Sequence, residues 1–130
     1  MGAKENADAI RGGYEAFNAG DMDRLGALFD ASAQWHVPGR SPMAGDYEGR
    51  DATFGYFGRI AQETGGNFRA ELRDLVASGD HVVGLHHSKG ERGGKTLDVA
   101  VALVFQMKGG KVVEAWEHYD DLYAWDDFWQ

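Results

Sequence analysis

The stretch Thr96-Leu-Asp-Val-Ala-Val-Ala-Leu-Val-Phe-Gln-Met107 decides the fold of this 130-residue chain. Side chains point to alternate faces along a β-strand, so the stretch divides into two sets. One set consists of Leu97, Val99, Val101, Leu103 and Phe105. The other includes Ala100, Ala102 and Val104. Because both faces are apolar, both should be covered, and we expect helices on one face and a second copy of the chain on the other, in a homodimer.

The segments around this strand predict an α+β domain. Apolar residues recur at helical spacing in three N-terminal segments, residues 7–17, 25–29 and 54–61, with Asp21 and Asp51 as candidate N-caps for the second and third helices. A short strand at 33–37 and a loop over 39–49 should separate the second helix from the third. Alternating segments follow at 68–76, 81–89 and 111–119, divided by glycine-bearing turns. Helices followed by an antiparallel meander predict one sheet covered by helices on one face.

Composition restricts the classes of function. The chain has no cysteine, which excludes disulfides and thiolate metal sites. Its formal net charge of -8 argues against nucleic acid and anionic membrane surfaces, because both attract basic patches. No apolar run approaches the ~20 residues of a membrane span, and residues 1–8 are too polar for a signal peptide. We therefore expect a single cytoplasmic domain over residues 1–130 that binds neither nucleic acid nor membranes.

The C-terminal segment, residues 116–130, points to a small-molecule pocket. It holds three of the four tryptophans, two of the five tyrosines and one phenylalanine, so it should cover something apolar. The same segment carries a histidine and four aspartates. Aromatic walls that carry a few polar groups are typical of ligand pockets. We expect Trp125, Phe128 and Trp129 to close either the pocket mouth or the dimer seam.

Four motifs give the chain a resemblance to a known superfamily. They are Tyr14-Glu-Ala-Phe-Asn-Ala-Gly-Asp21, Trp35-His-Val-Pro-Gly39, Ala44-Gly-Asp-Tyr-Glu-Gly-Arg50 and the segment 98–121. With them the chain resembles the nuclear transport factor 2-like superfamily and, within it, the SnoaL-like polyketide cyclases and the ketosteroid-isomerase-related proteins. The resemblance covers essentially the whole chain and implies a cone-shaped, curved antiparallel sheet packed against three N-terminal helices. This fold hosts isomerases, cyclases, epoxide hydrolases, dehydratases and binding modules, so it implies no single reaction.

Several catalytic residues of these relatives are missing. The catalytic positions of the ketosteroid isomerases correspond to Val37, Gly13 and Leu103, and none of these can exchange a proton. Steroid-type isomerisation is therefore not expected. SnoaL-type cyclases use an acid–base aspartate near the end of the last strand, and Asp120 or Asp121 corresponds to it.

The limonene-type epoxide hydrolases provide a second comparison. Their Asp-Arg-Asp constellation corresponds to His118, His86 and Ser88, with Gln34 and His36 in place of the residues that hold the water. That machinery is absent, yet two of its three central positions are imidazoles.

The last predicted strand supplies the candidate catalytic residues. Trp116, His118 and Asp120 share a face if no bulge intervenes, and the epoxide-hydrolase-like pattern directs this face inward. An imidazole beside a carboxylate can move protons near neutral pH. We therefore predict His118 and Asp120 as catalytic residues and Trp116 as a ligand contact. The alternatives are that His118 only hydrogen-bonds a buried neighbour and that Asp121 caps a following turn or helix.

Five other residues are predicted to contact the ligand: His86, His36, Tyr14, Trp35 and Tyr56. The resemblance directs His86 inward, and its neighbour His87 must then face outward. The direction of His36 depends on whether a bulge precedes Pro38. For Tyr14 and Trp35 the alternative is ordinary core packing, with only the Tyr14 hydroxyl at the pocket.

No metal and no cofactor are expected. His36, His86, His118 and Asp120 would form an acceptable ligand set for zinc or iron, but the sequence lacks the spacing that marks a metal site. Its glycine pairs lie in hairpin turns, away from any strand-to-helix phosphate loop.

The chain is therefore interpreted as a SnoaL-like enzyme with cofactor-independent acid–base chemistry. The reactions in range are cyclisation, isomerisation, dehydration or epoxide opening, on an apolar oxygenated substrate such as a polyketide or terpenoid. The alternative is a non-catalytic small-molecule-binding module of the same fold. Titratable groups with shifted pKa values inside a closed cavity would favour the enzyme.

Overall fold

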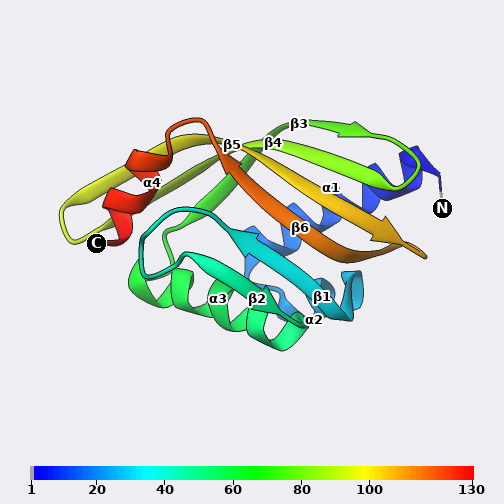
Figure 1. Cartoon of the computed structure of the whole chain (residues 1–130), viewed down its shortest axis with the longest axis horizontal. Helices are drawn as coiled ribbons and strands as arrows, with labels where there is room; N and C mark the ends of the chain where they lie inside the picture. Colours follow the sequence, from blue (N-terminus) through cyan, green and yellow to red (C-terminus); the bar gives the residue numbers. More distant parts are fainter. Residues whose placement is uncertain (1) are drawn as a thin grey trace.

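The computed structural model describes residues 2–130, which form one six-stranded sheet and four helices (Figure 1). The helices are α1 (Ala3–Ala19), α2 (Met22–Leu28), α3 (Arg50–Glu63) and α4 (Leu122–Trp129). The strands are β1 (Phe29–Val37), β2 (Gly45–Glu48), β3 (Arg69–Ala77), β4 (His81–Arg92), β5 (Lys95–Lys108) and β6 (Lys111–Tyr119). Within residues 2–130, no helix combines the length and the apolar character needed to cross a membrane.

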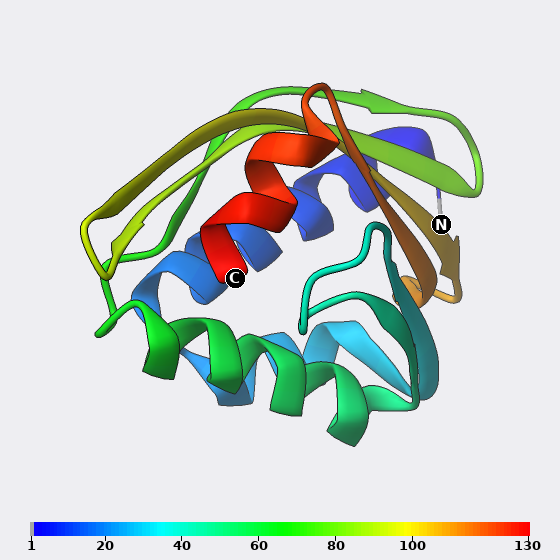
Figure 2. The same ribbon diagram turned by 60° about the vertical axis from the view of Figure 1, so that its left-hand side comes forward.

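The sheet has the strand order β2-β1-β6-β5-β4-β3 and is strongly curved. Figure 2 shows α1, α3 and α4 on its concave side. Strands β3 to β6 form the predicted antiparallel meander. One neighbouring pair departs from the prediction, because β1 runs parallel to β6. The mixed α+β architecture with three N-terminal helices is otherwise as predicted, and α4 is added at the C-terminus.

Several element boundaries differ from the predictions. The first strand begins at Phe29, which had been assigned to the second helix, and β2 lies inside the predicted loop. Asp51 is not the cap of α3, because the helix begins at Arg50 with Gly49 as N-cap at φ 94°. Asp21 does cap α2, and Asp121 caps α4 by accepting a hydrogen bond from the Ala124 N–H at 3.1 Å.

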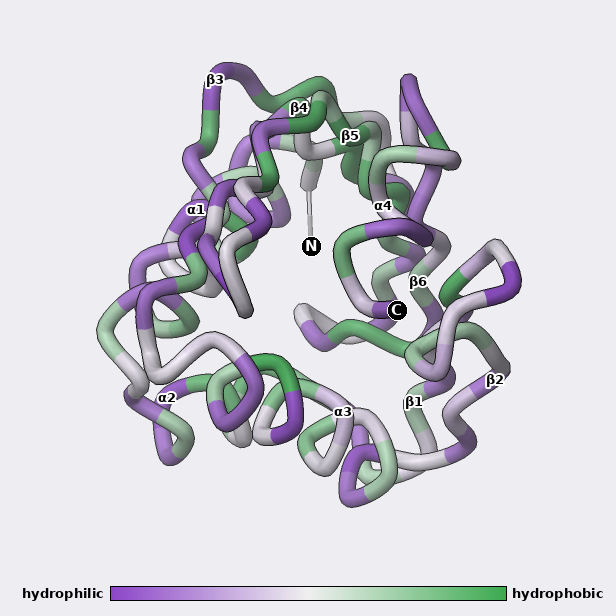
Figure 3. The backbone as a smooth tube through the Cα atoms, turned by 90° about the vertical axis from the view of Figure 1, so that its left-hand side faces the viewer, coloured by the Kyte–Doolittle hydropathy of each residue, from purple (hydrophilic) through white to green (hydrophobic). Residues whose placement is uncertain are grey.

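The core lies between the helices and the concave face of the sheet. The inward set of β5 is buried along the whole strand, whereas Ala100, Ala102 and Val104 on the convex face are half-buried. Figure 3 shows the sheet and helices α1, α2 and α3 arranged as a ring when the molecule is viewed from the end at which α4 lies. Trp125, Phe128 and Trp129 of α4 are fully buried in this core.

A β-bulge in β6 determines which residues of the last strand face inward. Met107 pairs with Val112 and Gln106 pairs with Glu114, so Val113 is an extra residue on β6. An extra residue reverses the alternation of everything that follows it. The predicted inward direction of Trp116, His118 and Asp120 is therefore wrong, since the inward residues after the bulge are Ala115, Glu117 and Tyr119.

Candidate functional site

A cavity of about 70 Å³ lies between the concave face of the sheet and the helices. Every helix and every strand except β2 contributes to its lining. Most of the lining is aromatic or aliphatic, and the members that carry a polar side-chain group are Tyr14, Trp35, Tyr56, His86, Ser88, Glu117, Tyr119 and Trp125. A dry cavity of roughly 150 Å³ holds a benzene ring. This cavity therefore admits only a very small molecule unless side chains in its wall move.

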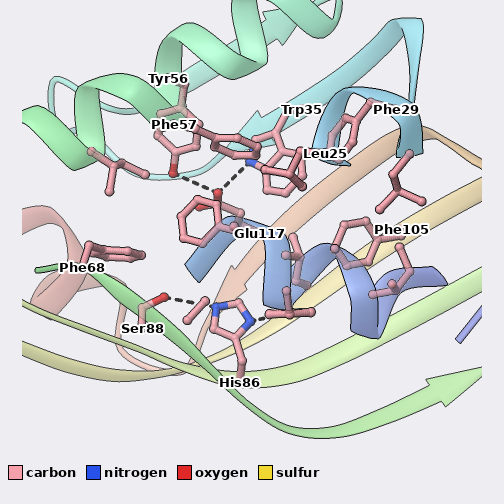
Figure 4. A pocket seen from close by; sticks show the side chains of 18 of the residues that line it. Leu25, Phe29, Trp35, Tyr56, Phe57, Phe68, His86, Ser88, Phe105 and Glu117 are labelled. Carbon is pink, nitrogen blue, oxygen red and sulfur yellow. Dashed lines mark hydrogen bonds between the residues drawn. The ribbon is translucent and has the colours of Figure 1, made fainter. Parts of the chain in front are cut away.

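Glu117 is the acidic group of the cavity, and three hydrogen bonds hold its carboxylate, of which Figure 4 shows those from Trp35 and Tyr56. The Trp35 Nε1–H and the Tyr56 hydroxyl donate to Oε2 at 2.7 and 2.9 Å. The Tyr119 hydroxyl donates to Oε1 at 2.6 Å. Residues from β1, α3 and β6 thus meet at this one carboxylate.

Burial raises the pKa of Glu117 above its usual range, although the three hydrogen bonds act in the opposite direction. Among the described residues that line the cavity there is no lysine or arginine to balance the charge. A carboxyl group with a raised pKa takes up a proton more readily than an exposed one, so it can act as a general acid or base. Glu117 is therefore the strongest acid–base candidate in the cavity.

A second polar group lies on the other wall, where Tyr14 of α1 meets β4. The Tyr14 hydroxyl lies 2.6 Å from Nδ1 of His86, and Nε2 of His86 lies 3.1 Å from the Ser88 hydroxyl. Burial lowers the pKa of His86 to about 4, and the charge of His87 acts in the same direction. Burial also raises the pKa of Tyr14. Both groups are thus neutral at pH 7, and the wall offers uncharged hydrogen-bonding groups.

Four of the eight predicted site residues line the cavity: Tyr14, Trp35, Tyr56 and His86. The other four, Trp116, His118, Asp120 and His36, do not, and His118 and Asp120 are exposed. For the three on β6 and its end, the reason is the bulge at Val113. The assignment of His118 and Asp120 to an inward-facing catalytic pair is therefore corrected.

His36 lies on the convex face, stacked on Trp116 with ring centroids 5.7 Å apart. Its Nδ1 and Nε2 each lie 2.6 Å from a carboxylate oxygen, of Asp46 and Glu114 respectively. Partial burial would lower the pKa of His36, but these hydrogen bonds and negative charges outweigh it and raise the pKa.

The three histidines considered as metal ligands do not converge. His86 lies in the cavity, whereas His36 and His118 belong to the opposite face of the sheet. No cluster of three or more metal-ligating side chains was found in residues 2–130.

Glu117 and Tyr119 line the cavity, although the sequence did not predict them there. Strict alternation along β6 puts both on the face opposite to Trp116 and His118, which is the face predicted to point outward. Nothing in the local sequence marks Val113 as the extra residue. Only the residue types in the sequence could have indicated the correct face. If Glu117 and Tyr119 point inward, tyrosine and tryptophan side chains are available to donate hydrogen bonds to the buried carboxylate.

A surface groove of about 400 Å³ adjoins the cavity. It lies between the C-terminal ends of α1 and α3, and it shares four lining residues with the cavity: Phe17, Phe57, Ile60 and Phe68. These four side chains contact both spaces.

The chain is similar over nearly its whole length to several solved structures. Bal32a, from a soil-derived mobile gene cassette, is 53% identical, with a TM-score of 0.97 and 98% of each chain covered. A protein of unknown function with a cystatin-like fold from Xanthomonas campestris is 27% identical, with a TM-score of 0.90 over 95% of this chain and 97% of that chain. IdmH from Streptomyces antibioticus, described as a candidate polyketide cyclase, is 25% identical, with a TM-score of 0.73 over 88% and 91%.

Sequence comparisons agree with the structural ones. An uncharacterized protein of Mycobacterium tuberculosis is 29% identical over 123 residues, which cover 94% of each chain. The family model of the SnoaL-like domain matches residues 10–115, which span α1 to β6 and include most of the cavity lining. The chain therefore belongs to the family of SnoaL-like domains.

Proposed function

We propose that this protein is a small-molecule enzyme in which Glu117 moves a proton on an apolar, oxygenated substrate held in the cavity. The observation that carries the proposal is the burial of this carboxyl group, with a raised pKa, among aromatic side chains. General acid–base catalysis works best when the pKa of the catalytic group lies near the working pH. The proposed chemistry needs no cofactor, because a carboxyl group and neutral donors are sufficient for proton transfer.

Four reaction types remain in range: cyclisation, isomerisation, dehydration and epoxide opening. In each, Glu117 would accept a proton from carbon, from a hydroxyl group or from water and return it later. The neutral hydroxyl group of Ser88, which is hydrogen-bonded to His86, would hold or polarise a substrate oxygen. The description of IdmH as a candidate polyketide cyclase supports this range of chemistry. The small volume of the cavity favours a substrate of few atoms over a large polycyclic one.

Proton exchange on small ketones tests the proposal. Cyclopentanone, cyclopent-2-enone and cyclopent-3-enone would be incubated with the protein in D₂O, and exchange and double-bond migration followed by proton NMR. Glu117→Gln should lose about 100-fold in rate. His118→Ala is the matched control, because the adjacent side chain is exposed on the other face. Exchange that is equally fast in Glu117→Gln would contradict the proposed role.

The alternative is a binding module of the same fold without catalysis. It is favoured by one observation, that three protein donors already satisfy Glu117. Probe binding without any Glu117-dependent exchange or isomerisation would establish this alternative.

We also propose that the protein forms a homodimer through the convex face of the sheet. The register places Val83, Val104 and Trp116 in one row across β4, β5 and β6. Leu85, which is 38% exposed, and Ala102 lie in the next row, which ends at His118. A second copy of the chain would cover this apolar surface.

A further inference from the structure

We infer that the Ser88 hydroxyl donates a hydrogen bond to the ligand, and that the ligand therefore carries a strong acceptor oxygen such as a ketone carbonyl. The inference concerns the same cavity as the proposed function and rests on that function only in taking the cavity as the ligand site. It assigns a role in binding and does not require catalysis.

Tyr14, His86 and Ser88 form a hydrogen-bonded series of three side chains. The two hydroxyl groups and the neutral imidazole each carry one polar hydrogen. Only two hydrogen bonds join the three side chains, one at each ring nitrogen of His86. One hydroxyl hydrogen therefore always remains outside this series, on either Tyr14 or Ser88.

The two hydrogen-bond lengths indicate whether Tyr14 or Ser88 holds that hydrogen. Hydroxyl donors make shorter bonds than N–H donors, about 2.5–3.0 Å for O–H···O against about 2.7–3.2 Å for N–H···O. The 2.6 Å separation of Tyr14 and Nδ1 fits the hydroxyl as donor, and the 3.1 Å separation of Nε2 and Ser88 fits the imidazole N–H as donor. We assign His86 the Nε2–H tautomer on this basis, so the remaining hydrogen belongs to Ser88.

The surroundings of Ser88 determine which acceptors its hydrogen can reach. Ser88 is 2% exposed and lines the cavity, and its hydrogen bond to His86 is the only one that its hydroxyl forms with the described residues. In that bond Ser88 is the acceptor. The Tyr14 hydroxyl, in contrast, lies against the backbone of β4 at Gly84. A buried donor without an acceptor carries a desolvation cost, which a ligand oxygen in the cavity would remove.

The ligand class follows from the two walls together. Figure 4 shows Glu117 beside Tyr56 and Trp35, and Ser88 beside His86 in another part of the cavity lining. Glu117 accepts hydrogen bonds and protons, whereas Ser88 donates. A small cyclic ketone presents an acceptor oxygen to Ser88 and C–H groups to the rest of the wall. A hydrocarbon of the same shape fills the cavity but leaves Ser88 without an acceptor.

Two probes of the same shape test the inference: cyclopentanone and methylenecyclopentane, in which a CH₂ group replaces the oxygen. Their dissociation constants would be measured by methyl NMR of the 130-residue protein. Ser88→Ala should weaken the binding of cyclopentanone about tenfold and leave that of methylenecyclopentane unchanged. Ser41→Ala, which removes another buried hydroxyl group outside the cavity lining, should change neither value.

Nitrogen-15 NMR of the histidine side chains supplies a readout that does not depend on any ligand. In the wild-type protein, the directly bonded proton of His86 should be on Nε2, with Nδ1 unprotonated. A proton on Nδ1 would overturn the inference. The inference would also be overturned if Ser88→Ala weakened the binding of both probes equally. The same holds if the wild-type protein binds neither probe, or binds both with the same dissociation constant.

The proposed function fails separately from this inference. Glu117→Gln should keep the preference for ketone over hydrocarbon even if the protein catalyses nothing. Binding discrimination that depends on Ser88, in a protein without any Glu117-dependent chemistry, would support the inference and contradict the enzyme. Glu117-dependent chemistry in a protein that does not distinguish the two probes would support the enzyme and contradict the inference.

Discussion

The hydroxyl of Tyr14 occupies the space in which a side chain at Gly84 would lie. Tyr14 comes from α1 and Gly84 from β4, and the absence of a Cβ atom allows the helix to approach the strand at this point. The approach also brings the hydroxyl within 2.6 Å of His86, two residues further along the strand. The contact between Tyr14 and His86 in the cavity wall thus depends on Gly84, because only glycine leaves room for the Tyr14 hydroxyl.

Gly84→Ala should therefore displace Tyr14 and break its hydrogen bond to His86. We expect a loss of about 1–3 kcal/mol in the free energy of unfolding, as in other overpacked cores. Urea unfolding measures it. Gly58→Ala is the control, because a Cβ atom at this position on α3 meets nothing within 4 Å and alanine favours a helix by up to about 1 kcal/mol. Equal stability of the two variants would contradict the close approach of Tyr14.

Acid should destabilise the protein through His86. Its pKa is lowered from 6.5 to about 4 in the folded state, so the unfolded chain binds the extra proton between these values. The contribution of neutral His86 is complete above pH 6.5 and is lost as the pH falls towards 4, by about 3 kcal/mol in total. His86→Gln should lack this component. Urea unfolding at pH 7, 5.5 and 4 should show the gap between wild type and variant narrowing on acidification, and a constant gap would refute the prediction.

Glu117 should act on stability in the opposite direction. Its pKa is raised in the folded state, so its stabilising contribution is present below the unfolded value of 4.5 and is lost as the pH rises through the folded pKa. Relative to wild type, Glu117→Gln should therefore gain stability as the pH rises from 4 to 8. Thermal unfolding of both proteins across this range tests the sign. A gain for the variant on acidification instead would show that the three hydrogen bonds outweigh burial.

The proposed dimer predicts a different class of variant. Val104→Lys places a charge in the middle of the convex face, between Val83 and Trp116. It should convert the dimer to a monomer at micromolar concentration, because a stable interface of roughly 1,200–2,000 Å² does not bury an unpaired charge. Tyr123→Lys is the control, since Tyr123 is 85% exposed on α4. Light scattering measures both, and a wild-type monomer would exclude the dimer.

Local sequence was enough for the parts of the structure that depend on neighbouring residues. The alternation from Leu97 to Phe105 identified β5 and its buried face, and the helical spacing around Tyr14 identified α1. The family resemblance then supplied the overall arrangement, and four predicted ligand contacts do line the cavity. The predictions of β5 and α1 succeeded because each rests on a period that the backbone geometry imposes locally, whereas the inward direction of His86 came from the resemblance.

Tertiary structure alone decided which acid lies in the cavity and which hydroxyl group is available as a hydrogen-bond donor to a ligand. The bulge at Val113 depends on how β6 pairs with β5, and one extra residue exchanges His118 for Glu117 on the inward face. The contact between Tyr14 and His86 joins residues 72 positions apart, through a helix that packs on Gly84. Register and packing between distant segments are set by the whole sheet, so the sequence of β6 by itself does not reveal which of its two faces holds the acid.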